Sequence, residues 1–170
     1  MSKLYLVRHA EPALTGVILG RCDPPLSDAG KRDAGAIALP DVVVVYTSEL
    51  RRARDTALAI GIAPVIVDPD LNEISYGQWD GRTWSDIEQM FPVQAKAKLA
   101  CWTAVTPPGG EEWADFELRI SRALARIQAG SFPAAVVAHI TVHAQIAYCL
   151  SGSDPSQFTQ EYCEVLTYAF

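Results

Sequence analysis

Short apolar runs alternate along the chain with segments of helical period, and this alternation restricts the folds that the chain can adopt. Runs with the length of a buried strand lie at Lys3–Val7, Val42–Tyr46, Pro64–Val67, Ala134–Ala138 and Val165–Phe170. Continuous apolar runs are typical of strands covered on both faces. We therefore predict an α/β fold, a three-layer α/β/α sandwich around a mostly parallel sheet, with the last run as an edge or antiparallel strand.

The helical segments lie between these runs. The four predicted helices run from Ser27 towards Leu39, over Leu50–Ile60, over Trp113–Ile127 and over Thr141–Leu150. Ser27 is a residue that commonly caps a helix start, and Gly61 is one that stops a helix. In the third helix, apolar residues recur every three or four positions, which places Arg119, Arg122 and Arg126 on other faces.

Length and charge limit the classes of protein. The chain has 170 residues, which predicts one domain spanning residues 1–170, with a core that needs no disulfide or structural metal. A net charge of −6 argues against a partner such as nucleic acid or an anionic membrane, because binding phosphate backbones needs a basic excess.

The cysteines and the N-terminus point to a reducing compartment. The cysteines are widely spaced and form no C-x-x-C pair; they are Cys22, Cys101, Cys149 and Cys163. There is no signal-peptide pattern and no apolar run of about 20 residues that could span a bilayer. We expect a cytoplasmic protein with reduced thiols, and no pattern indicates its oligomeric state.

Chemically active residues follow several of the predicted strands. They are Arg8 and His9 after the first strand, Ser48, Arg51 and Arg52 after the second, Glu73 after the third and His139 after the fourth. Each of these residues, taken alone, could simply be a solvated residue at a strand end or a buried, hydrogen-bonded residue. Because parallel strands meet ligands at their carboxyl ends, we expect these groups to converge at one edge of the sheet.

Two of these features have specific electrostatic consequences. Arg51 and Arg52 open a helix, where the helix dipole disfavours cations, so a nearby anion is expected. His139 and His143 have the i, i+4 spacing of metal ligands but lack the glutamate of H-E-x-x-H. A metallohydrolase built on this pair is one alternative, and a site without a metal is favoured.

Six segments, in order, are similar to the motifs of one family. LVRHAEP resembles L-x-R-H-G-E, GRCDPPLSDAG resembles G-x-x-D-x-P-L-x-x-x-G, and TSELRRARDTA resembles S-x-L-x-R-A-x-x-T-A. LNEISYGQWDG matches L-x-E-x-x-x-G-x-W-x-G, PPGGEEWADFELRI resembles a P-x-G-E segment, and VVAHITVH resembles V-x-S-H-G. Over nearly its whole length, the chain resembles the histidine phosphatase superfamily, with the phosphoglycerate mutase-like fold.

The resemblance implies roles for individual residues. It makes His9 the nucleophile that accepts the phosphoryl group and Glu73 the acid that protonates the leaving group. The implied phosphate-binding residues are Arg8, Arg52, His139 and, at a position where the family often has asparagine, Thr15. The chain departs from the family at Ala10, Ala138 and Ile140, where glycine, serine and glycine are usual.

The function implied is hydrolysis of a small phosphorylated metabolite through a phosphohistidine intermediate, with no cofactor and no metal. Only residues 81–108 are available to cover the site, so we predict net hydrolysis in preference to mutase-type phosphoryl transfer. The pattern is most similar to the α-ribazole phosphatase branch, which suggests α-ribazole 5′-phosphate as substrate. The other alternative is a relative that binds phosphate without catalysis, suggested by Ala10 and Ile140.

The tryptophans all lie between residues 79 and 113. They either pack the segment 81–108 onto the body of the domain or line a pocket for an apolar leaving group.

Overall fold

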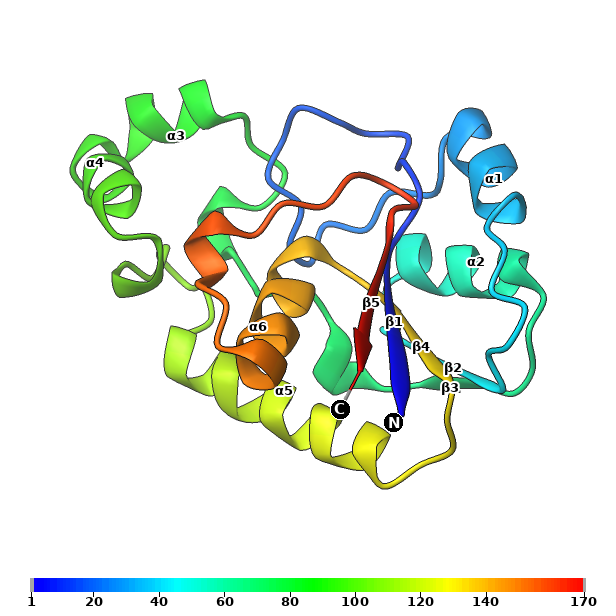
Figure 1. Ribbon diagram of the computed structural model, residues 1–170. Coiled ribbons are helices and arrows are strands. Elements are labelled where there is room, and N and C mark those ends of the chain that lie inside the picture. Colours follow the sequence, from blue (N-terminus) through cyan, green and yellow to red (C-terminus); the bar gives the residue numbers. More distant parts are fainter. Residues whose placement is uncertain (1, 170) are drawn as a thin grey trace.

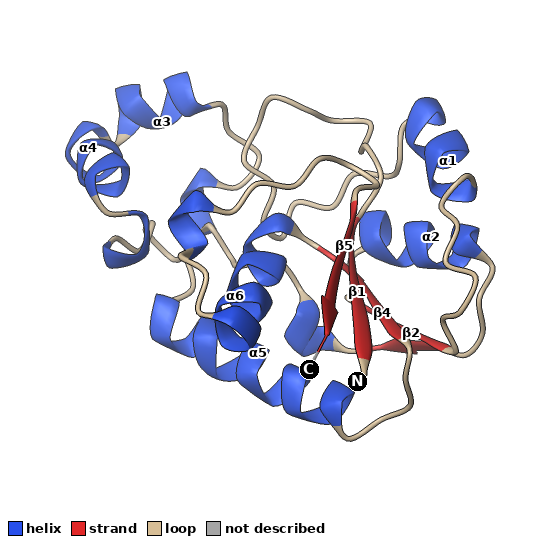
Figure 2. Ribbon diagram, in the orientation of Figure 1, coloured by secondary structure: helices blue, strands red, loops and turns tan. Residues whose placement is uncertain are grey.

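The computed structural model describes residues 2–169, which form a central sheet with helices on both of its faces (Figures 1 and 2). The strands are β1 (Lys3–Arg8), β2 (Val44–Thr47), β3 (Val65–Val67), β4 (Ala134–Ala138) and β5 (Val165–Ala169). The helices are α1 (Asp28–Gly35), α2 (Arg51–Ile60), α3 (Trp84–Met90), α4 (Pro92–Ala100), α5 (Trp113–Gln128) and α6 (Ile140–Ser151). Four short 3₁₀ turns are η1 (Pro69–Leu71), η2 (Gly77–Trp79), η3 (Trp102–Ala104) and η4 (Pro155–Gln157).

The sheet has the strand order β3-β2-β4-β1-β5. Neighbouring strands from β3 to β1 pair in parallel, and β5 pairs antiparallel with β1 at the edge. This confirms the predicted mostly parallel sheet and the antiparallel last strand. Phe170, which we expected to end that strand, lies outside the described residues.

Alternate residues of the strands supply two separate cores, which confirms the three-layer arrangement. Leu6 of β1 and Val136 of β4 pack in the same cluster as Ile120 of α5 and Ile146 of α6. Their sequence neighbours Val7 and Val137 face the other way, into a cluster that includes Ala57 of α2. Successive side chains of a strand point to opposite faces, so one continuous apolar run serves both layers.

The first predicted helix is shorter than expected. Ser27 caps α1 as predicted, its side chain accepting a hydrogen bond from the amide of Gly30, but the helix ends at Gly35 and does not reach Leu39. Leu39 precedes Pro40, whose ring disfavours the helical conformation in the residue before it. Leu39 is instead buried in the core on the α2 side of the sheet.

The segment 81–108 contains α3, α4 and η3, which project beyond the sheet (Figure 1). An aromatic cluster holds this segment to the body: the buried Trp79 contacts Trp84 edge-on at 5.9 Å and Phe91 at 6.2 Å between ring centroids. Trp84 in turn lies 6.2 Å from Trp102. Trp79 and Trp84 therefore pack the segment 81–108 onto the body of the domain, which was one of the two roles considered for the tryptophans. No helix within residues 2–169 meets the length and hydropathy needed to cross a bilayer.

Candidate active site

The two histidines at the strand ends lie side by side. His9 follows β1 and His139 follows β4, and these strands are direct neighbours in the sheet. The amide of His9 donates a hydrogen bond to the carbonyl of Ala138, at 3.0 Å. The two imidazole rings are 5.1 Å apart between centroids, so the strand ends bring together residues 130 positions apart in sequence.

His9 is held in one tautomer. Its Nδ1 lies 2.8 Å from the carbonyl oxygen of Ala10, and because a carbonyl only accepts, Nδ1 carries the proton. The other ring nitrogen, Nε2, is left with its lone pair. Burial lowers the pKa of His9 to about 3, and the positive charges of Arg52 and Arg8 act in the same direction. The ring is therefore neutral over the ordinary pH range.

Ala10, a departure from the family pattern, fits its place. The amide of Ala10 donates to Thr56 Oγ1 at 3.0 Å, and the residue packs in a small buried cluster with Leu26 and Ala34. Its methyl group supports the turn after β1 and does not occupy the pocket.

His139 is fully buried and hydrogen-bonded to Ser48. Its Nε2 lies 2.8 Å from Ser48 Oγ, and Ser48 comes from the end of β2. Its Nδ1 is buried and has no partner among the described residues. Burial lowers the pKa of His139 well below its ordinary value, helped by the charge of Arg52, so the ring is neutral. The polar residues at the ends of β1, β2 and β4 thus converge as expected.

Arg8 contacts the chain segment that precedes β5. Its Nη1 donates to the carbonyl of Gln160 at 2.6 Å, and the guanidinium carbon lies 4.1 Å from the centre of the Tyr162 ring. The Nε of Arg8 is buried without a partner among residues 2–169. Neither Gln160 nor Tyr162 was singled out from the sequence, because both lie on an aperiodic loop.

Arg52 lies deeper than a simple phosphate ligand would. Its terminal nitrogens donate to the carbonyls of Leu19, Gly20 and Cys22 and to the carboxylate of Asp23. Among the guanidinium nitrogens of Arg52, only Nε, which is also buried, has no hydrogen-bond partner among the described residues. The same Asp23 accepts a hydrogen bond from the amide of Arg51 at 2.6 Å, so it is the anion expected at the start of α2.

Asp80 is a second residue that binds the loop contacted by Arg52. The carboxylate of Asp80, in the G-x-W-x-G turn, accepts hydrogen bonds from the amides of Gly20, Arg21 and Cys22. Arg52 therefore binds the carbonyls of the segment and Asp80 binds its amides. The two motifs, distant in sequence, together fix the loop that forms one wall of the pocket.

Glu73 is buried opposite the histidines, in the loop after η1. Its Oε1 accepts from the amide of Ile74 at 2.9 Å, and its Oε2 accepts from the amide of Thr141, in the first turn of α6, at 3.3 Å. Burial raises the pKa of Glu73, although the Ile74 hydrogen bond and the charge of Arg52 oppose this rise. A carboxyl group that keeps its proton to higher pH is suited to protonate a leaving group.

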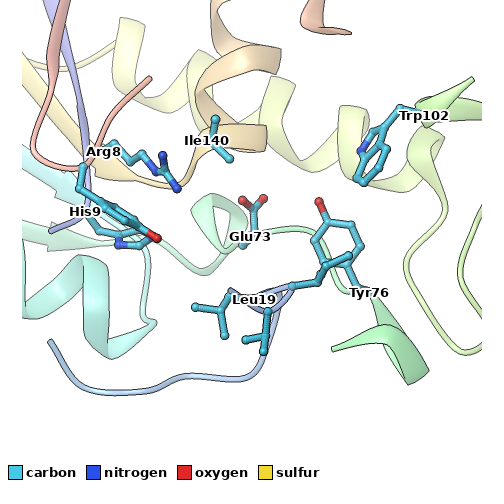
Figure 3. Close-up of a pocket in the computed structure, with 10 residues that line it drawn as sticks. Arg8, His9, Leu19, Glu73, Tyr76, Trp102 and Ile140 are labelled. Atoms are coloured by element: carbon cyan, nitrogen blue, oxygen red, sulfur yellow. The ribbon is translucent and has the colours of Figure 1, made fainter. Parts of the chain in front are cut away.

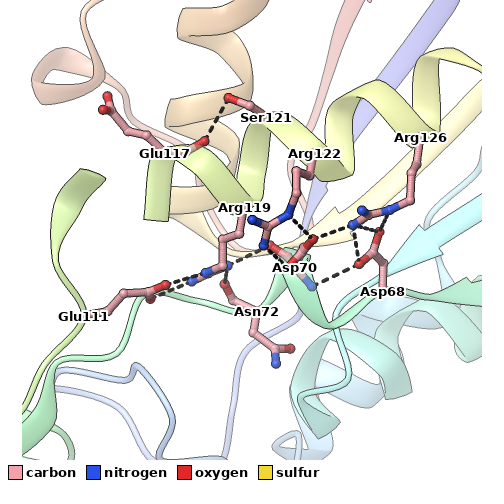
Figure 4. Close-up of polar contacts among 9 residues, drawn as sticks. All are labelled: Asp68, Asp70, Asn72, Glu111, Glu117, Arg119, Ser121, Arg122 and Arg126. Atoms are coloured by element: carbon pink, nitrogen blue, oxygen red, sulfur yellow. Dashed lines mark hydrogen bonds and ion pairs between the residues drawn. The ribbon is translucent and has the colours of Figure 1, made fainter. Parts of the chain in front are cut away.

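The loop that carries Glu73 is fixed by a buried arginine (Figure 4). Arg119 of α5 pairs with Glu111 through two hydrogen bonds of 2.6 and 2.8 Å and donates to the carbonyls of Asp70, Asn72 and Glu73. The helical pattern placed Arg119, Arg122 and Arg126 off the apolar face of α5; of these three residues, Arg119 is buried. Glu111 is the glutamate of the P-x-G-E segment. Because it pairs with Arg119, its role here is structural.

These groups surround a cavity of about 200 Å³ (Figure 3). Its lining includes Arg8, His9, Glu73 and Ile140. Arg52 and His139 are not among the lining residues, but the positive charge of Arg52 lowers the pKa of His9 and opposes the rise in the pKa of Glu73. The predicted phosphate ligand Thr15 is exposed and does not line the cavity.

Apart from Tyr76, the remaining lining residues come from segments that the motifs did not cover. The loop that includes Thr15 contributes Val17, Ile18 and Leu19 to the wall in its place. Tyr76 and Trp102 close one end, and Tyr162 lies beside His9, 5.6 Å from its ring. The pocket therefore joins a charged, polar end to a predominantly apolar one.

His139 and His143, the pair considered as an alternative metal site, each have a hydrogen-bond partner on one ring nitrogen. His143 Nδ1 lies 2.8 Å from Gln160 Oε1, and the amide nitrogen of Gln160 is committed to the carbonyls of Leu6 and Glu164. Across the described range, no three His, Cys, Asp or Glu side chains are grouped to hold a metal ion. His143 instead anchors the loop that contacts Arg8.

The sheet thus carries two neighbouring histidines at its carboxyl edge, and a buried carboxyl group lines the same pocket as His9. Residues 4–168 match the family model of the histidine phosphatase superfamily, branch 1. The chain belongs to this superfamily, as the motifs predicted.

Individual relatives agree with this assignment. A bifunctional protein of Mycobacterium tuberculosis is 35% identical over 152 residues, which cover 82% of this chain and 42% of that protein. The chain thus spans less than half of that relative. Phosphoserine phosphatase 1 of Hydrogenobacter thermophilus is 32% identical, with 99% of this chain and 85% of that protein covered. The crystal structure of the α-ribazole phosphatase from Shigella flexneri matches with a TM-score of 0.86 at 26% identity, covering 97% of this chain and 89% of that one.

Proposed function

We propose that the protein hydrolyses small phosphate monoesters through a covalent phosphohistidine at His9. The observation that carries this proposal is the hydrogen bond from His9 Nδ1 to the carbonyl of Ala10, which leaves Nε2 as a neutral nucleophile. A covalent intermediate divides one difficult hydrolysis into two easier steps.

In the first step, His9 Nε2 attacks the phosphorus atom and the bond between phosphorus and the ester oxygen breaks. The leaving oxygen takes the proton of the Glu73 carboxyl group and departs as an alcohol. In the second step, Glu73 as carboxylate takes a proton from water, whose oxygen attacks the phosphorus. The bond between phosphorus and Nε2 breaks, and phosphate and the neutral imidazole are regenerated.

Fixed positive charge stabilises the phosphoryl oxygens during transfer. Arg8 lines the pocket, and Arg52 adds charge from behind, with its Nε–H as the donor still available. The N-terminus of α6, immediately after His139, contributes the positive end of a helix dipole. Because these groups supply the charge, we propose that the reaction needs no metal ion.

We propose net hydrolysis and not phosphoryl transfer between substrates. A mutase must keep water away from its phosphoenzyme, whereas the segment 81–108 supplies only α3, α4 and η3 as a cover. The relatives above named as phosphatases support the same choice. Their two names point to different substrates, and α-ribazole 5′-phosphate remains our proposed substrate because it also agrees with the sequence motifs.

The experiment is hydrolysis of p-nitrophenyl phosphate in EDTA by the wild type, His9→Ala and His9→Asn. The asparagine variant keeps a donor near the Ala10 carbonyl but lacks a nucleophile. The proposal requires activity that survives chelation and is lost in both variants. Metal-dependent turnover, or turnover without His9, contradicts it. A protein that binds phosphate but hydrolyses no ester would be the non-catalytic relative, and efficient interconversion of phosphoglycerates would be the mutase.

A further inference from the structure

The side chain of Gln160 is a buried polar group that no step of the proposed reaction uses. Gln160 lies in the loop between η4 and β5 and is 3% exposed. Its Oε1 lies 2.8 Å from Nδ1 of His143, and its Nε2 donates to the carbonyls of Leu6 and Glu164 at 2.9 Å each. The side-chain amide therefore connects α6, β1 and the end of the loop that precedes β5.

These bonds hold a loop whose backbone is strained at one residue. Cys163 has a φ of 60°, in the left-handed region that residues other than glycine rarely adopt. Within the loop, the amide of Glu164 donates to the carbonyl of Glu161 at 3.2 Å, and the amide of Glu161 donates to the carboxylate of Glu164 at 2.6 Å. A strained conformation persists only where surrounding contacts determine it. The side chain of Gln160 supplies such contacts from the body of the domain, because two of its partners belong to α6 and β1.

The same loop sets the position of Arg8, at the end of β1 (Figure 1). In the backbone, the amide of Arg8 donates to the carbonyl of Glu164 at 3.2 Å, and the carbonyl of Arg8 accepts from the amide of Cys163 at 3.1 Å. In the side chain, Nη1 donates to the carbonyl of Gln160 at 2.6 Å, and the guanidinium carbon lies 4.1 Å from the Tyr162 ring centre. Both the backbone and the side chain of Arg8 are therefore placed by the loop that Gln160 anchors.

The guanidinium group of Arg8 keeps a donor for a substrate. Arg8 lines the pocket beside His9 (Figure 3), and its Nε is buried with no hydrogen-bond partner among the described residues. Because a guanidinium group is planar and rigid, the bond from Nη1 to the carbonyl of Gln160 also fixes the direction of Nε–H. A donor that is oriented before the substrate binds stabilises developing charge without reorganising during the reaction.

We propose that Gln160 is a positioning residue for Arg8: its side-chain amide holds the loop before β5 so that the guanidinium group is oriented for the phosphoryl group before substrate binds. The inference rests on the proposed phosphatase function and adds a residue to its phosphate-binding arrangement. Gln160 is not among the residues that line the pocket, so it acts through the loop and not by contact with the substrate.

The test replaces the side-chain amide and leaves the backbone carbonyl in place. Gln160→Met keeps the length of the side chain and removes all three hydrogen bonds. Gln160→Glu keeps an acceptor for His143 Nδ1 and removes the two donors. The matched control is Gln145→Met, because Gln145 is a buried glutamine of α6 whose amide donates to Cys149, and its hydrogen bonds among the described residues involve neither Arg8 nor its loop.

Phosphate affinity is the first readout, because in the proposed reaction Arg8 binds the phosphoryl group and not the leaving group. Calorimetric titration with inorganic phosphate should show a dissociation constant about 10- to 100-fold higher in both Gln160 variants, as expected for the loss of one oriented hydrogen bond between charged groups. The value of kcat/KM should fall by the same factor for propyl phosphate and p-nitrophenyl phosphate, since no proton transfer is impaired. Gln145→Met should match the wild type in both measurements, and circular dichroism checks that each variant is folded.

A double-mutant cycle separates positioning from a general structural role. Arg8→Ala removes the guanidinium group that Gln160 orients. In that background, Gln160→Met should change kcat/KM and phosphate affinity by less than about 2-fold, because no guanidinium group remains to be oriented. Losses that multiply in the double variant would mean that the two residues act independently.

Wild-type phosphate affinity in a folded Gln160 variant, a larger loss for propyl phosphate than for p-nitrophenyl phosphate, or independent effects in the cycle would overturn the positioning role alone. Either Gln160 variant carries the test, so poor folding of one leaves the test in force. A wild type that binds phosphate but hydrolyses no ester would overturn the proposed phosphatase function, and the calorimetric titration would still test the role of Gln160.

Discussion

The guanidinium group of Arg119 donates a hydrogen bond to the backbone carbonyl of Glu73 at 3.3 Å, while the Glu73 side chain lines the pocket. The same guanidinium binds the carbonyls of Asp70 and Asn72 at 2.7 Å each and pairs with Glu111. Glu111 also accepts from the amide of Ser75. Residues on both sides of Glu73 are thus fixed to α5, which makes Arg119 a positioning residue for the proposed acid.

Replacing this guanidinium should weaken acid catalysis selectively. In Arg119→Lys the single ammonium group cannot make the paired contact with Glu111 and reach three carbonyls. We expect kcat for propyl phosphate to fall further than kcat for p-nitrophenyl phosphate, since only the alkoxide needs a proton. The free energy of unfolding should fall by about 1–3 kcal/mol.

Arg122→Lys is the matched control, because Arg122 lies on the same helix with an exposed ion pair to Asp70. It should leave the ratio of the two rates unchanged. Equal losses for both esters in Arg119→Lys would contradict a positioning role and indicate general damage to the site.

Glu73→Gln should slow the hydrolysis of alkyl phosphates far more than that of p-nitrophenyl phosphate, and this difference should be larger than in Arg119→Lys. Glutamine has nearly the same shape but no proton to donate, so hydrolysis of alkyl phosphates should fall by about 10²–10⁴-fold. p-Nitrophenyl phosphate, whose leaving group is stable as an anion, should lose much less. Steady-state kinetics on both esters measures the difference, and a uniform loss would argue against Glu73 as the acid.

The proposed mechanism predicts a pH dependence set by His9 and Glu73. Glu73 acts when protonated, so alkyl ester hydrolysis should decline as the pH rises through its raised pKa. His9 acts when neutral, so with a pKa of about 3 it should limit kcat/KM only in strong acid. Glu73→Gln should lack the alkaline decline once the substrate's own ionisation has been accounted for. Persistence of that decline in the variant would assign it to another group.

Tyr162 should matter for phosphate affinity through Arg8. Its ring lies 4.1 Å from the guanidinium carbon, a geometry of cation–π attraction worth about 0.5–2 kcal/mol. We expect Tyr162→Ala to weaken competitive inhibition by inorganic phosphate by about 2- to 30-fold. Tyr162→Phe keeps the ring and should retain most of the affinity. A phenylalanine variant as weak as the alanine variant would assign the effect to the hydroxyl group.

His143 should make the protein less stable in mild acid. Burial lowers its pKa to about 4, below the value of about 6.5 expected in the unfolded chain. Between these values the unfolded state binds more protons, so stability falls as the pH decreases from about 6.5 towards 4. The slope contributed by one such histidine is at most about 1.4 kcal/mol per pH unit.

His143→Asn isolates this contribution. Asparagine can still donate to Gln160 Oε1 but does not titrate. Denaturant unfolding at several pH values should show a shallower acid loss in the variant than in the wild type. Identical slopes would mean that His143 does not carry the effect.

The sheet and the convergence of His9 and His139 could be predicted because they depend on local pattern and strand polarity. Apolar runs such as Ala134–Ala138 indicate buried parallel strands, and parallel strands bring their carboxyl ends, with His9 and His139, to one edge. The order of the strands carries no comparable local signal.

Other parts of the site depend on tertiary contacts that no periodicity encodes. The helical pattern places Arg119 off the apolar face of its helix, but it does not indicate that the loop of Glu73 supplies three carbonyls to its guanidinium group. Tyr162 lies on an aperiodic loop, and only the pairing of β5 with β1 brings that loop to Arg8. Thr15 shows the reverse, because its motif position suggests a phosphate ligand while its loop leaves it exposed.

The most direct measurement is to trap the phosphoenzyme. The protein is mixed with a substrate in excess, quenched within milliseconds under conditions that preserve phosphohistidine, and mapped by mass spectrometry. The account predicts a burst of alcohol release and a phosphoryl group on His9, bonded to Nε2, and neither in His9→Asn. Steady turnover with no phosphoenzyme, or a phosphoryl group on a residue other than His9, would contradict it.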